Sequence, residues 1–381
     1  MTLSFKRITS SGNFIPEIDG LRFIAIVSVV LFHLSNFLSQ KAKNIYSDEF
    51  GFSFLKRVLS NGDLGVPLFF IVSGFILGMP FAKFHLHKGK AINLKDYFSR
   101  RLTRLEPPYI LCMTVLLFGS VFIAKNLSLI PALKSYFASI FYIHNFVYGK
   151  GTLPLLNAVA WSLEIEVQFY ILAPLLAYIF CINSALKRRI FLYASATLFL
   201  ILNHLIAPPF ISLFNYVHYF LIGFLLVDLY ISPSNFLPKT KFDSLIGLVL
   251  FILIWIYNKK QFDSNMNKWI ADTIQLNCIF IFYYYILINK IFQFLSLRLI
   301  TNIGGMCYSI YLLHYPIISM LGNPLVSHSF SKNIYIDISI YTIILLSAIL
   351  LISSFFFLLI ERPCMDKNWY KRIFNPQSYR K

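Results

Sequence analysis

The sequence predicts an all-α polytopic integral membrane protein with about ten transmembrane helices and with both termini in the cytoplasm. Hydrophobic residues make up 57% of the 381 residues and charged residues only 13%, whereas a soluble domain has nearer to about 25% charged residues. Apolar stretches long enough to cross a bilayer recur along the chain. Basic residues gather in alternate loops between these stretches, as in membrane proteins of fixed orientation.

Ten stretches approach the length of roughly 17–25 residues that a membrane-spanning helix requires. They lie near residues 21–38, 64–81, 108–124, 159–182, 190–207, 211–230, 243–258, 269–288, 299–321 and 336–360. An amphipathic or re-entrant segment is expected at 133–148, and Pro208–Pro209 predict a tight hairpin between the fifth and sixth spans. No polar stretch is long enough for a separate soluble domain, so residues 1–381 are expected to form a single membrane domain.

The formal net charge of +18 arises from 34 Lys and Arg residues against 16 Asp and Glu residues. With a cytoplasmic N-terminus, the inner segments hold 23 of the 34 basic residues and the outer loops hold 11. This asymmetry obeys the positive-inside rule. The charge therefore reports topology, and we expect membrane lipids rather than nucleic acid as the partners of these residues.

Arg22 and His33 lie 11 residues apart in the first span, which opens on Asp19. After three helical turns the direction returns to within about 20°, so both side chains share one face with about 16 Å of rise between them. Ionisable residues inside spans are costly and usually line sites or pathways. Arg22 alone would fit an interfacial anchor and His33 a packed polar residue, but the aligned pair favours a functional role.

His33, Glu166 and His314 are expected at similar depth in the outer half of the membrane. The first span places His33 about 8 Å below its outer end, and the fourth places Glu166 about 10 Å below the same surface. His314 lies in the outer half of the ninth span. Each would cost roughly 2–3 kcal/mol or more if it faced lipid unpaired. Depth alone leaves their lateral arrangement open.

Glu164 and Glu166 differ by about 200° around a helix and therefore point to nearly opposite sides. Glu166 is the candidate for chemistry, because Glu164 lies nearer to the interface and is expected to be solvated. Tyr170, one turn further on, is in range to hydrogen-bond Glu166. Trp161 fits either an interfacial anchor or a part of the site.

A basic cluster precedes the third span. Arg101 and Arg104, one helical turn apart, are placed to grip phosphates bidentately, and with Arg22 they suit a polyphosphate such as that of coenzyme A. The alternative is that they contact lipid headgroups. The chain has no P-loop, dinucleotide or zinc motif, so no metal or bound cofactor is expected. His85 and His87 are interpreted as part of a solvated turn.

These segments resemble the membrane acyltransferase-3 family, which O-acylates cell-surface glycans and some small molecules. The resemblance rests on EIDGLR, GVPLFFIVSGF, SRRLTRLEPPY, WSLEIEVQFY, YSIYLLHYPI and IERP, which occur in family order between about residues 17 and 363. Family members often have Asp where this chain has Pro67 and Glu where it has Val167, so these positions are not essential here. An SGNH-type esterase domain like that of some relatives is not expected, so the chain is interpreted as a stand-alone membrane unit.

The resemblance implies an enzyme of the bacterial inner (plasma) membrane with acyl-CoA as co-substrate and no bound cofactor. Acetyl is the expected acyl group, with succinyl or longer groups as alternatives, and a glycan or lipid-linked glycan is the expected acceptor. His33 and Glu166 would be catalytic in the outer half, and Arg22, Arg101 and Arg104 would bind acyl-CoA at the cytoplasmic side. Supporting or substrate-binding roles fall to Asp19, Ser73, Trp161, Tyr170, Tyr308 and His314.

Two routes fit these residues. A neutral His33 could deprotonate the acceptor hydroxyl while Glu166 orients the imidazole or stabilises its charged form. Alternatively, His33 could carry the acyl group covalently. Ser73 could also be a nucleophile, but a Ser next to Gly in a membrane helix more often permits close packing.

A different class of protein also fits buried His and Glu in ten spans, namely a proton-coupled transporter or a flippase of a sugar or lipid-linked glycan. Such transporters usually contain internal repeats. The two halves of this chain show none, which favours the enzyme.

Overall fold

The computed structural model describes residues 14–45, 58–206, 208–233, 236–256, 265–331 and 333–366, together with residues 5 and 369. This described part consists of helices and loops, with no strand. Six of its helical segments are long and apolar enough to cross a membrane: Pro16–Lys41, Gly62–His87, Leu94–Ile123, Ala158–Cys181, Lys268–Asn289 and Ile334–Cys364. The all-α membrane class is confirmed, although six such segments are fewer than the ten expected spans.

The helices follow the order of the expected spans. The first half forms α1 (Pro16–Ile45), α3 (Gly65–His87), α4 (Leu94–Phe118), α5 (Leu129–Ile140), α6 (His144–Tyr148), α7 (Trp161–Leu176) and α8 (Ala185–Leu205). The second half forms α9 (Val217–Ile231), α10 (Asp243–Ile256), α11 (Asn265–Tyr284), α12 (Arg298–Gly305), α13 (Cys307–Val326), α14 (Ile334–Phe356) and α15 (Arg362–Cys364). The π-helical segments η2 (Gly119–Ile123), η7 (Tyr285–Asn289) and η9 (Phe357–Glu361) extend α4, α11 and α14.

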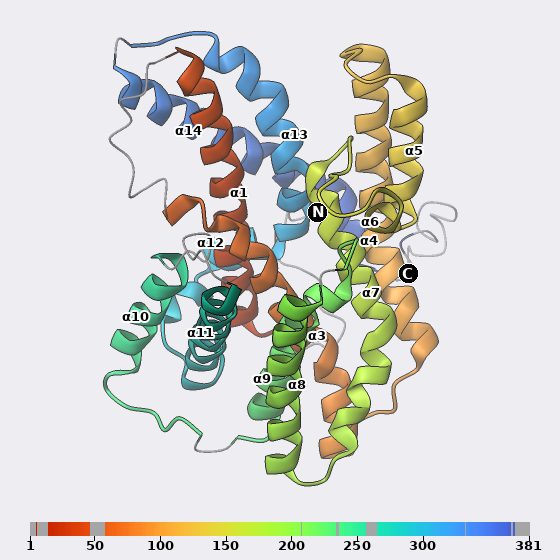
Figure 1. Cartoon of the computed structure of the whole chain (residues 1–381), viewed down its shortest axis with the longest axis vertical. Helices are drawn as coiled ribbons and strands as arrows, with labels where there is room; N and C mark the ends of the chain where they lie inside the picture. Colours follow the sequence, from red (N-terminus) through yellow and green to blue (C-terminus); the bar gives the residue numbers. More distant parts are fainter. Residues whose placement is uncertain are drawn as a thin grey trace, which may run out of the picture.

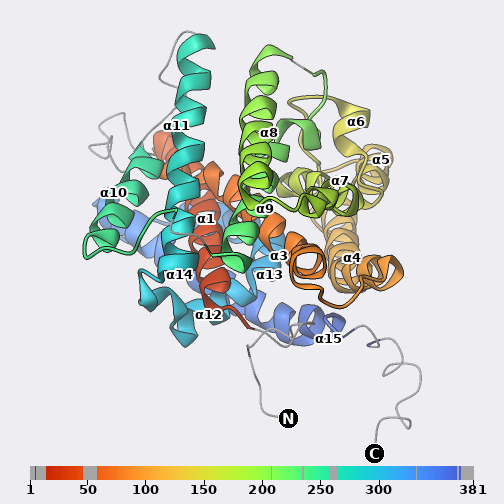
Figure 2. The same ribbon diagram turned by 90° about the horizontal axis from the view of Figure 1, so that it is seen from below.

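Helix α1 occupies the middle of the bundle. Figure 1 shows α4 and α5 along one edge and α10 and α11 along the opposite edge. The turned view places α1 between α3, α13 and α11 (Figure 2), and α1 contacts α3, α12 and α13. Side chains on α1 can therefore reach partners from both halves of the chain.

The ninth expected span is broken in the structure. Helix α12 ends at Gly305, and α13 begins at Cys307 after a break at Met306. Gly304 lies so close to α1 that a Cβ there would be only 1.8 Å from the backbone oxygen of Asp19. The break at Met306 thus lies two residues after the point where α12 contacts the backbone of α1.

The other differences concern helix length. The sixth and seventh expected spans form helices of only 15 and 14 residues, α9 and α10. The hairpin expected at Pro208–Pro209 exists, because α8 and α9 pack together. Its connection is longer than the two prolines, however, since α9 begins only at Val217 after a short 3-10 turn at Leu213–Asn215. The amphipathic segment expected at 133–148 forms α5 and α6.

Helices α3 and α9 cross at two glycines. A Cβ at Gly74 would lie 2.3 Å from the backbone oxygen of Phe220, and one at Gly223 would lie 2.4 Å from that of Ile71. Small residues allow such close backbone contact between helices inside a membrane. The packing role expected for Ser73 therefore belongs to its neighbour Gly74.

Helix α4 begins 14 residues before the expected third span, at Leu94, where the side chain of Asn93 accepts hydrogen bonds from the backbone N–H groups of Lys95 and Asp96. An Asn at this position satisfies otherwise unpaired helix N–H groups. The helix continues through Pro107 and Pro108. Arg101 and Arg104 thus lie on the same helix as the third span and not in a loop before it.

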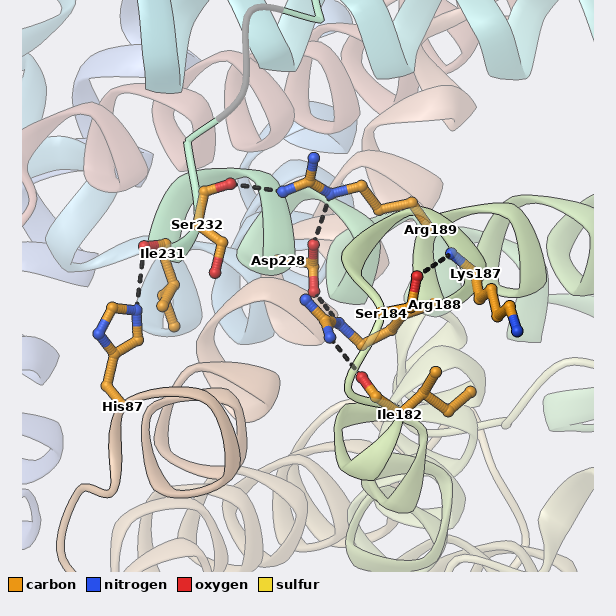
Figure 3. Close-up of polar contacts among 9 residues, drawn as sticks. All are labelled: His87, Ile182, Ser184, Lys187, Arg188, Arg189, Asp228, Ile231 and Ser232. Carbon is orange, nitrogen blue, oxygen red and sulfur yellow. Dashed lines mark hydrogen bonds and ion pairs between the residues drawn. The ribbon is translucent and has the colours of Figure 1, made fainter.

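Two of the basic residues counted toward the cytoplasmic loops form a buried ion cluster between α8 and α9. The Asp228 carboxylate lies between the guanidinium groups of Arg188 and Arg189 (Figure 3). Arg188 also donates to the carbonyl of Ile182, and Arg189 donates to that of Ser232. Asp228 is fully buried and Arg188 nearly so. The cluster ties the start of α8 to the end of α9.

Removing the carboxylate would leave one buried and one partly buried guanidinium group, Arg188 and Arg189, without a counter-charge. We therefore expect Asp228→Ala to destabilise the fold by about 3–5 kcal/mol, as loss of one partner of a buried pair does. The midpoint of thermal unfolding in detergent measures this effect. Lys187→Ala, an exposed neighbour, is the control and should leave the midpoint unchanged. Equal midpoints for both variants would contradict a stabilising role of Asp228.

Candidate active site

A cavity of about 680 Å³ opens among α1, α3, α4, α7 and α13. Its charged lining comprises Arg22, Lys83, Lys90, Arg100, Arg101 and Arg104 against Asp96 and Glu166. Six basic and two acidic side chains give the cavity a net positive charge. Its volume falls within the range of roughly 300–1,000 Å³ that is usual for small-molecule sites.

Arg101 is held between two tyrosine rings. Its guanidinium carbon lies 3.7 Å from the ring centroid of Tyr97 and 5.8 Å from that of Tyr170. One terminal nitrogen donates to the backbone oxygen of Tyr97 at 2.9 Å. The Nε atom is buried and has no hydrogen-bond partner among the described residues. The rings fix the plane of the guanidinium group while part of its donor capacity stays open.

Arg104 also keeps a buried Nε atom without a hydrogen-bond partner in the described ranges. Its terminal nitrogen lies 4.0 Å from Oε1 of Glu361, a long ion pair. Guanidinium groups bind carboxylates and phosphates through paired N–H donors. Arg101 and Arg104 thus both line the cavity, and the hydrogen-bond donors of their guanidinium groups are not all used by described residues.

Arg22 differs from the other two arginines because it has a close counter-ion. Its terminal nitrogen lies 2.8 Å from Oδ1 of Asp19, and both side chains are buried. Asp19 therefore orients Arg22 and offsets its charge. Arg22 reaches the cavity, whereas Asp19 is not part of its lining.

Glu166 is one of the two carboxylates that line the cavity, and it is hydrogen-bonded to two hydroxyl groups. Its Oε1 atom accepts from Ser73 Oγ at 2.8 Å and from the hydroxyl of Tyr170. The contact with Tyr170 matches the one-turn spacing noted in the sequence. Ser73 points into the cavity, so its hydroxyl serves Glu166 while the adjacent glycine supplies the close helix packing.

Glu164 was expected to be solvated, and this is wrong. It is 2% exposed, and its Oε2 accepts the backbone N–H of Asn145 at 2.9 Å. The segment around α6 folds over the N-terminal end of α7 and covers it, which hydropathy could not indicate. The expected opposite orientation of Glu164 and Glu166 is observed, because their partners lie on different elements.

His33 and His314 form a pair outside the lining of this cavity. Nε2 of His314 lies 3.1 Å from Nδ1 of His33. The structure does not bring His33 to Glu166, because the hydrogen bonds of His33 go to Val29 and His314. The ring of Tyr311 lies between the two centres, since it lines the cavity and its centroid is 5.8 Å from that of His314.

Of the remaining predicted residues, some line the cavity and others lie outside it. Tyr308 lines the cavity and donates its hydroxyl to the backbone oxygen of Leu105 at 3.0 Å, next to Arg104. Trp161 lies outside the lining, half-buried, with its ring 5.7 Å from that of Tyr216. His87 is exposed, and one of its ring nitrogens lies 3.2 Å from the carbonyl of Ile231. Within the described ranges, no group of three or more His, Cys, Asp or Glu residues is arranged to hold a metal ion.

Glu361 is a site residue that the sequence did not single out. It is fully buried at the end of η9, where its Oε2 accepts from the backbone N–H and hydroxyl of Ser309. Its other oxygen faces Arg104. In the sequence, Glu361 is visible as the single carboxylate at the end of the last apolar stretch, in IERP. Only the fold shows that its side chain points into the protein.

Six apolar helical segments and a cation-lined cavity define a polytopic membrane protein with room for an anionic ligand. The chain belongs to the acyltransferase-3 family, because the model of this acyltransferase domain matches residues 15–358. The resemblance noted in the sequence is confirmed. No solved structure matches the chain.

The relatives of the chain include O-acetyltransferases. The chain is 28% identical to the O-acetyltransferase OatA of Staphylococcus aureus strain NCTC 8325. The alignment, 415 positions long with its gaps, covers 99% of this chain and 62% of the relative. The OatA proteins of strains COL and MW2 match with the same identity and coverage. The chain thus spans about 62% of the length of these relatives.

Substitutions of the two glutamates of α7 should differ in their effect on the stability of the protein. Glu164→Ala leaves the buried N–H of Asn145 unsatisfied, which should destabilise the protein by about 1–3 kcal/mol. Glu166→Gln keeps the shape and most hydrogen bonds inside an open cavity and should unfold near the wild-type temperature. Thermal unfolding of both variants in the same detergent tests this, and a larger loss in Glu166→Gln would reverse the assignment.

Proposed function

We propose that the protein is a membrane O-acyltransferase that moves an acyl group, most simply acetyl, from cytoplasmic acyl-CoA to a hydroxyl of a cell-surface or lipid-linked glycan in the bacterial inner membrane. The observation that carries the proposal is the cavity in which Arg101 and Arg104 keep buried, unused guanidinium donors. Family membership and the O-acetyltransferase relatives supply the reaction type.

The donor end of the proposed site is the arginine-rich part of the cavity. Lys83 and Lys90 belong to the same lining as Arg101 and Arg104 and lie near the connection between α3 and α4. Coenzyme A carries a pyrophosphate and a 3′-phosphate, and these anions suit paired guanidinium donors. The positive-inside rule assigns this connection to the cytoplasm, where acyl-CoA is made.

A cytoplasmic position of both chain ends fits the same arrangement. Ile15 and Met365, which lie near the two ends of the described chain, line the cavity together with Lys90. An even number of membrane crossings, ten in this proposal, would leave both ends on the donor side.

The acceptor end of the proposed site contains His33. A neutral imidazole there removes the proton from the glycan hydroxyl as the hydroxyl attacks the acyl carbonyl, or it carries the acyl group before transfer. Glu166, bonded to Ser73 and Tyr170 inside the cavity, lies nearer to the donor. In this proposal it orients groups around the thioester rather than the ring of His33.

Transfer itself is the primary test. The purified full chain in liposomes is supplied with [14C]acetyl-CoA and saccharides extracted from the cell envelope, and label bound covalently to saccharide is measured. We expect labelling by the wild type and none by His33→Ala or His33→Gln, both folded by size-exclusion chromatography. Uptake of unmodified saccharide without labelling would instead support a transporter, and full activity of His33→Ala would remove His33 from the mechanism.

Substitution of the cavity arginines should weaken the binding of acetyl-CoA and leave the binding of saccharide unchanged. Arg101→Lys and Arg104→Lys keep the charge but lose the paired donors, so each should raise the KM for acetyl-CoA by roughly tenfold and leave the KM for saccharide unchanged. Arg22→Lys should have a smaller effect, because Asp19 already offsets its charge. Arg298→Lys, an exposed residue outside the cavity, is the control. Unchanged acetyl-CoA KM in both cavity variants would contradict a phosphate-binding role.

A further inference from the structure

The proton positions in the His33–His314 pair follow from the hydrogen-bond partners of the two rings. His314 is fully buried in α13, and its Nδ1 lies 3.0 Å from the backbone oxygen of Ile310. A carbonyl oxygen only accepts hydrogen bonds, so Nδ1 of His314 must carry a hydrogen. In a neutral imidazole the other nitrogen is then an acceptor. Nε2 of His314 therefore presents a lone pair to His33.

The same reasoning fixes the ring of His33. Its Nδ1 lies 3.0 Å from the backbone oxygen of Val29 and 3.1 Å from Nε2 of His314. Both neighbours are acceptors, so this nitrogen must also carry a hydrogen, which the two share. A charged His314 would place a second hydrogen in the 3.1 Å gap, opposite the first. The donor pattern thus requires a neutral His314.

We infer that His314 is a positioning residue that fixes His33 as the tautomer protonated at Nδ1 and leaves Nε2 free to act on the glycan hydroxyl. The inference rests on the proposed function, in which His33 acts on that hydroxyl. All hydrogen bonds of His33 among the described residues go through Nδ1. Nε2 is therefore the ring atom available to a substrate.

The backbone of Val29 alone would favour the same tautomer but would not fix the ring. Val29 lies one turn away on the helix of His33, so this contact does not tie the imidazole to any other element. His314 adds a contact from α13. The rings of Phe32 and Tyr315, with centroids 5.1 Å and 5.3 Å from that of His33, flank the imidazole edge-on. Together they hold Nε2 in one direction.

His314 also has a role while the proton moves. As the glycan oxygen attacks the acyl carbonyl, its proton passes to Nε2 of His33, and the imidazolium then donates from Nδ1 to His314. When the carbon–sulfur bond breaks, Nε2 of His33 releases the proton that it took from the glycan to the departing coenzyme A thiolate. The ester and the thiol are therefore the only products. A hydrogen bond from a charged donor is stronger than a neutral one. His314 thus stabilises the step in which His33 is charged.

The test compares two substitutions of similar size. His314→Gln can offer a side-chain oxygen to Nδ1 of His33, whereas His314→Leu cannot accept a hydrogen bond. With [14C]acetyl-CoA and the envelope saccharide extract, we expect His314→Leu to lower kcat roughly 10- to 100-fold with unchanged KM values. His314→Gln should recover most of kcat. Equal rates for the two variants would overturn the inference.

A second measurement does not depend on the folding of any variant at position 314. The 15N chemical shifts of the histidine rings distinguish the two neutral tautomers, and the signals of His33 are identified by their loss in His33→Gln. Wild-type protein should show His33 protonated at Nδ1, and protonation at Nε2 would overturn the inference. If the wild type transferred no label to saccharide, the proposed function would fail. If His33→Ala kept full activity, His33 would be removed from the mechanism, and this inference would fail with it. If His33→Ala were inactive while His314→Leu matched wild type, only the role of His314 would fail.

Discussion

The close approach of α12 to α1 determines how the site residues of α1 and α13 lie relative to one another. Because Gly304 has no side chain, the backbone of α12 can rest on that of Asp19, and the chain then turns at Met306 into α13. Helix α13 runs beside α1 from there. Arg22 consequently shares the cavity with Tyr308, and His33 meets His314. A larger residue at 304 would separate the two helices that carry these pairs.

Buried charge in this protein falls into two kinds. Arg188 and Arg189 are paired with Asp228, and Arg22 is paired with Asp19, so these groups are compensated within the fold. Arg101 and Arg104 are different, because buried donors on both remain unused in the described part of the chain. Arg104 has only the 4.0 Å contact with Glu361 as an ion pair, and leaving buried donors unpaired is costly. This contrast is the reason why the proposed function assigns donor binding mainly to Arg101 and Arg104.

Hydropathy and helical periodicity predicted the membrane class, the opposite orientation of the two α7 glutamates and the contact between Tyr170 and Glu166. They could not predict lateral neighbours, which depend on how helices pack. The pairing of His33 with His314 instead of Glu166 depends on α13 lying beside α1. The burial of Glu164 depends on α6 folding over α7. Ser73 and Gly74 were likewise assigned together from a two-residue pattern, whereas the fold gives them separate roles.

The π-helical segment at 357–361 gives the chain a length requirement as well as a composition requirement. A π turn accommodates one more residue than an α turn, and here it ends on Glu361, which is bonded to Ser309. Deleting a single residue from this segment would convert the π turn into an α turn and leave the following residues in nearly the same direction. Deleting a second residue would rotate them by about 100° and turn the carboxylate away from Ser309 and Arg104. Related sequences should therefore tolerate apolar exchanges along α14, and a gap of one residue just before Arg362, more readily than a gap of two residues there.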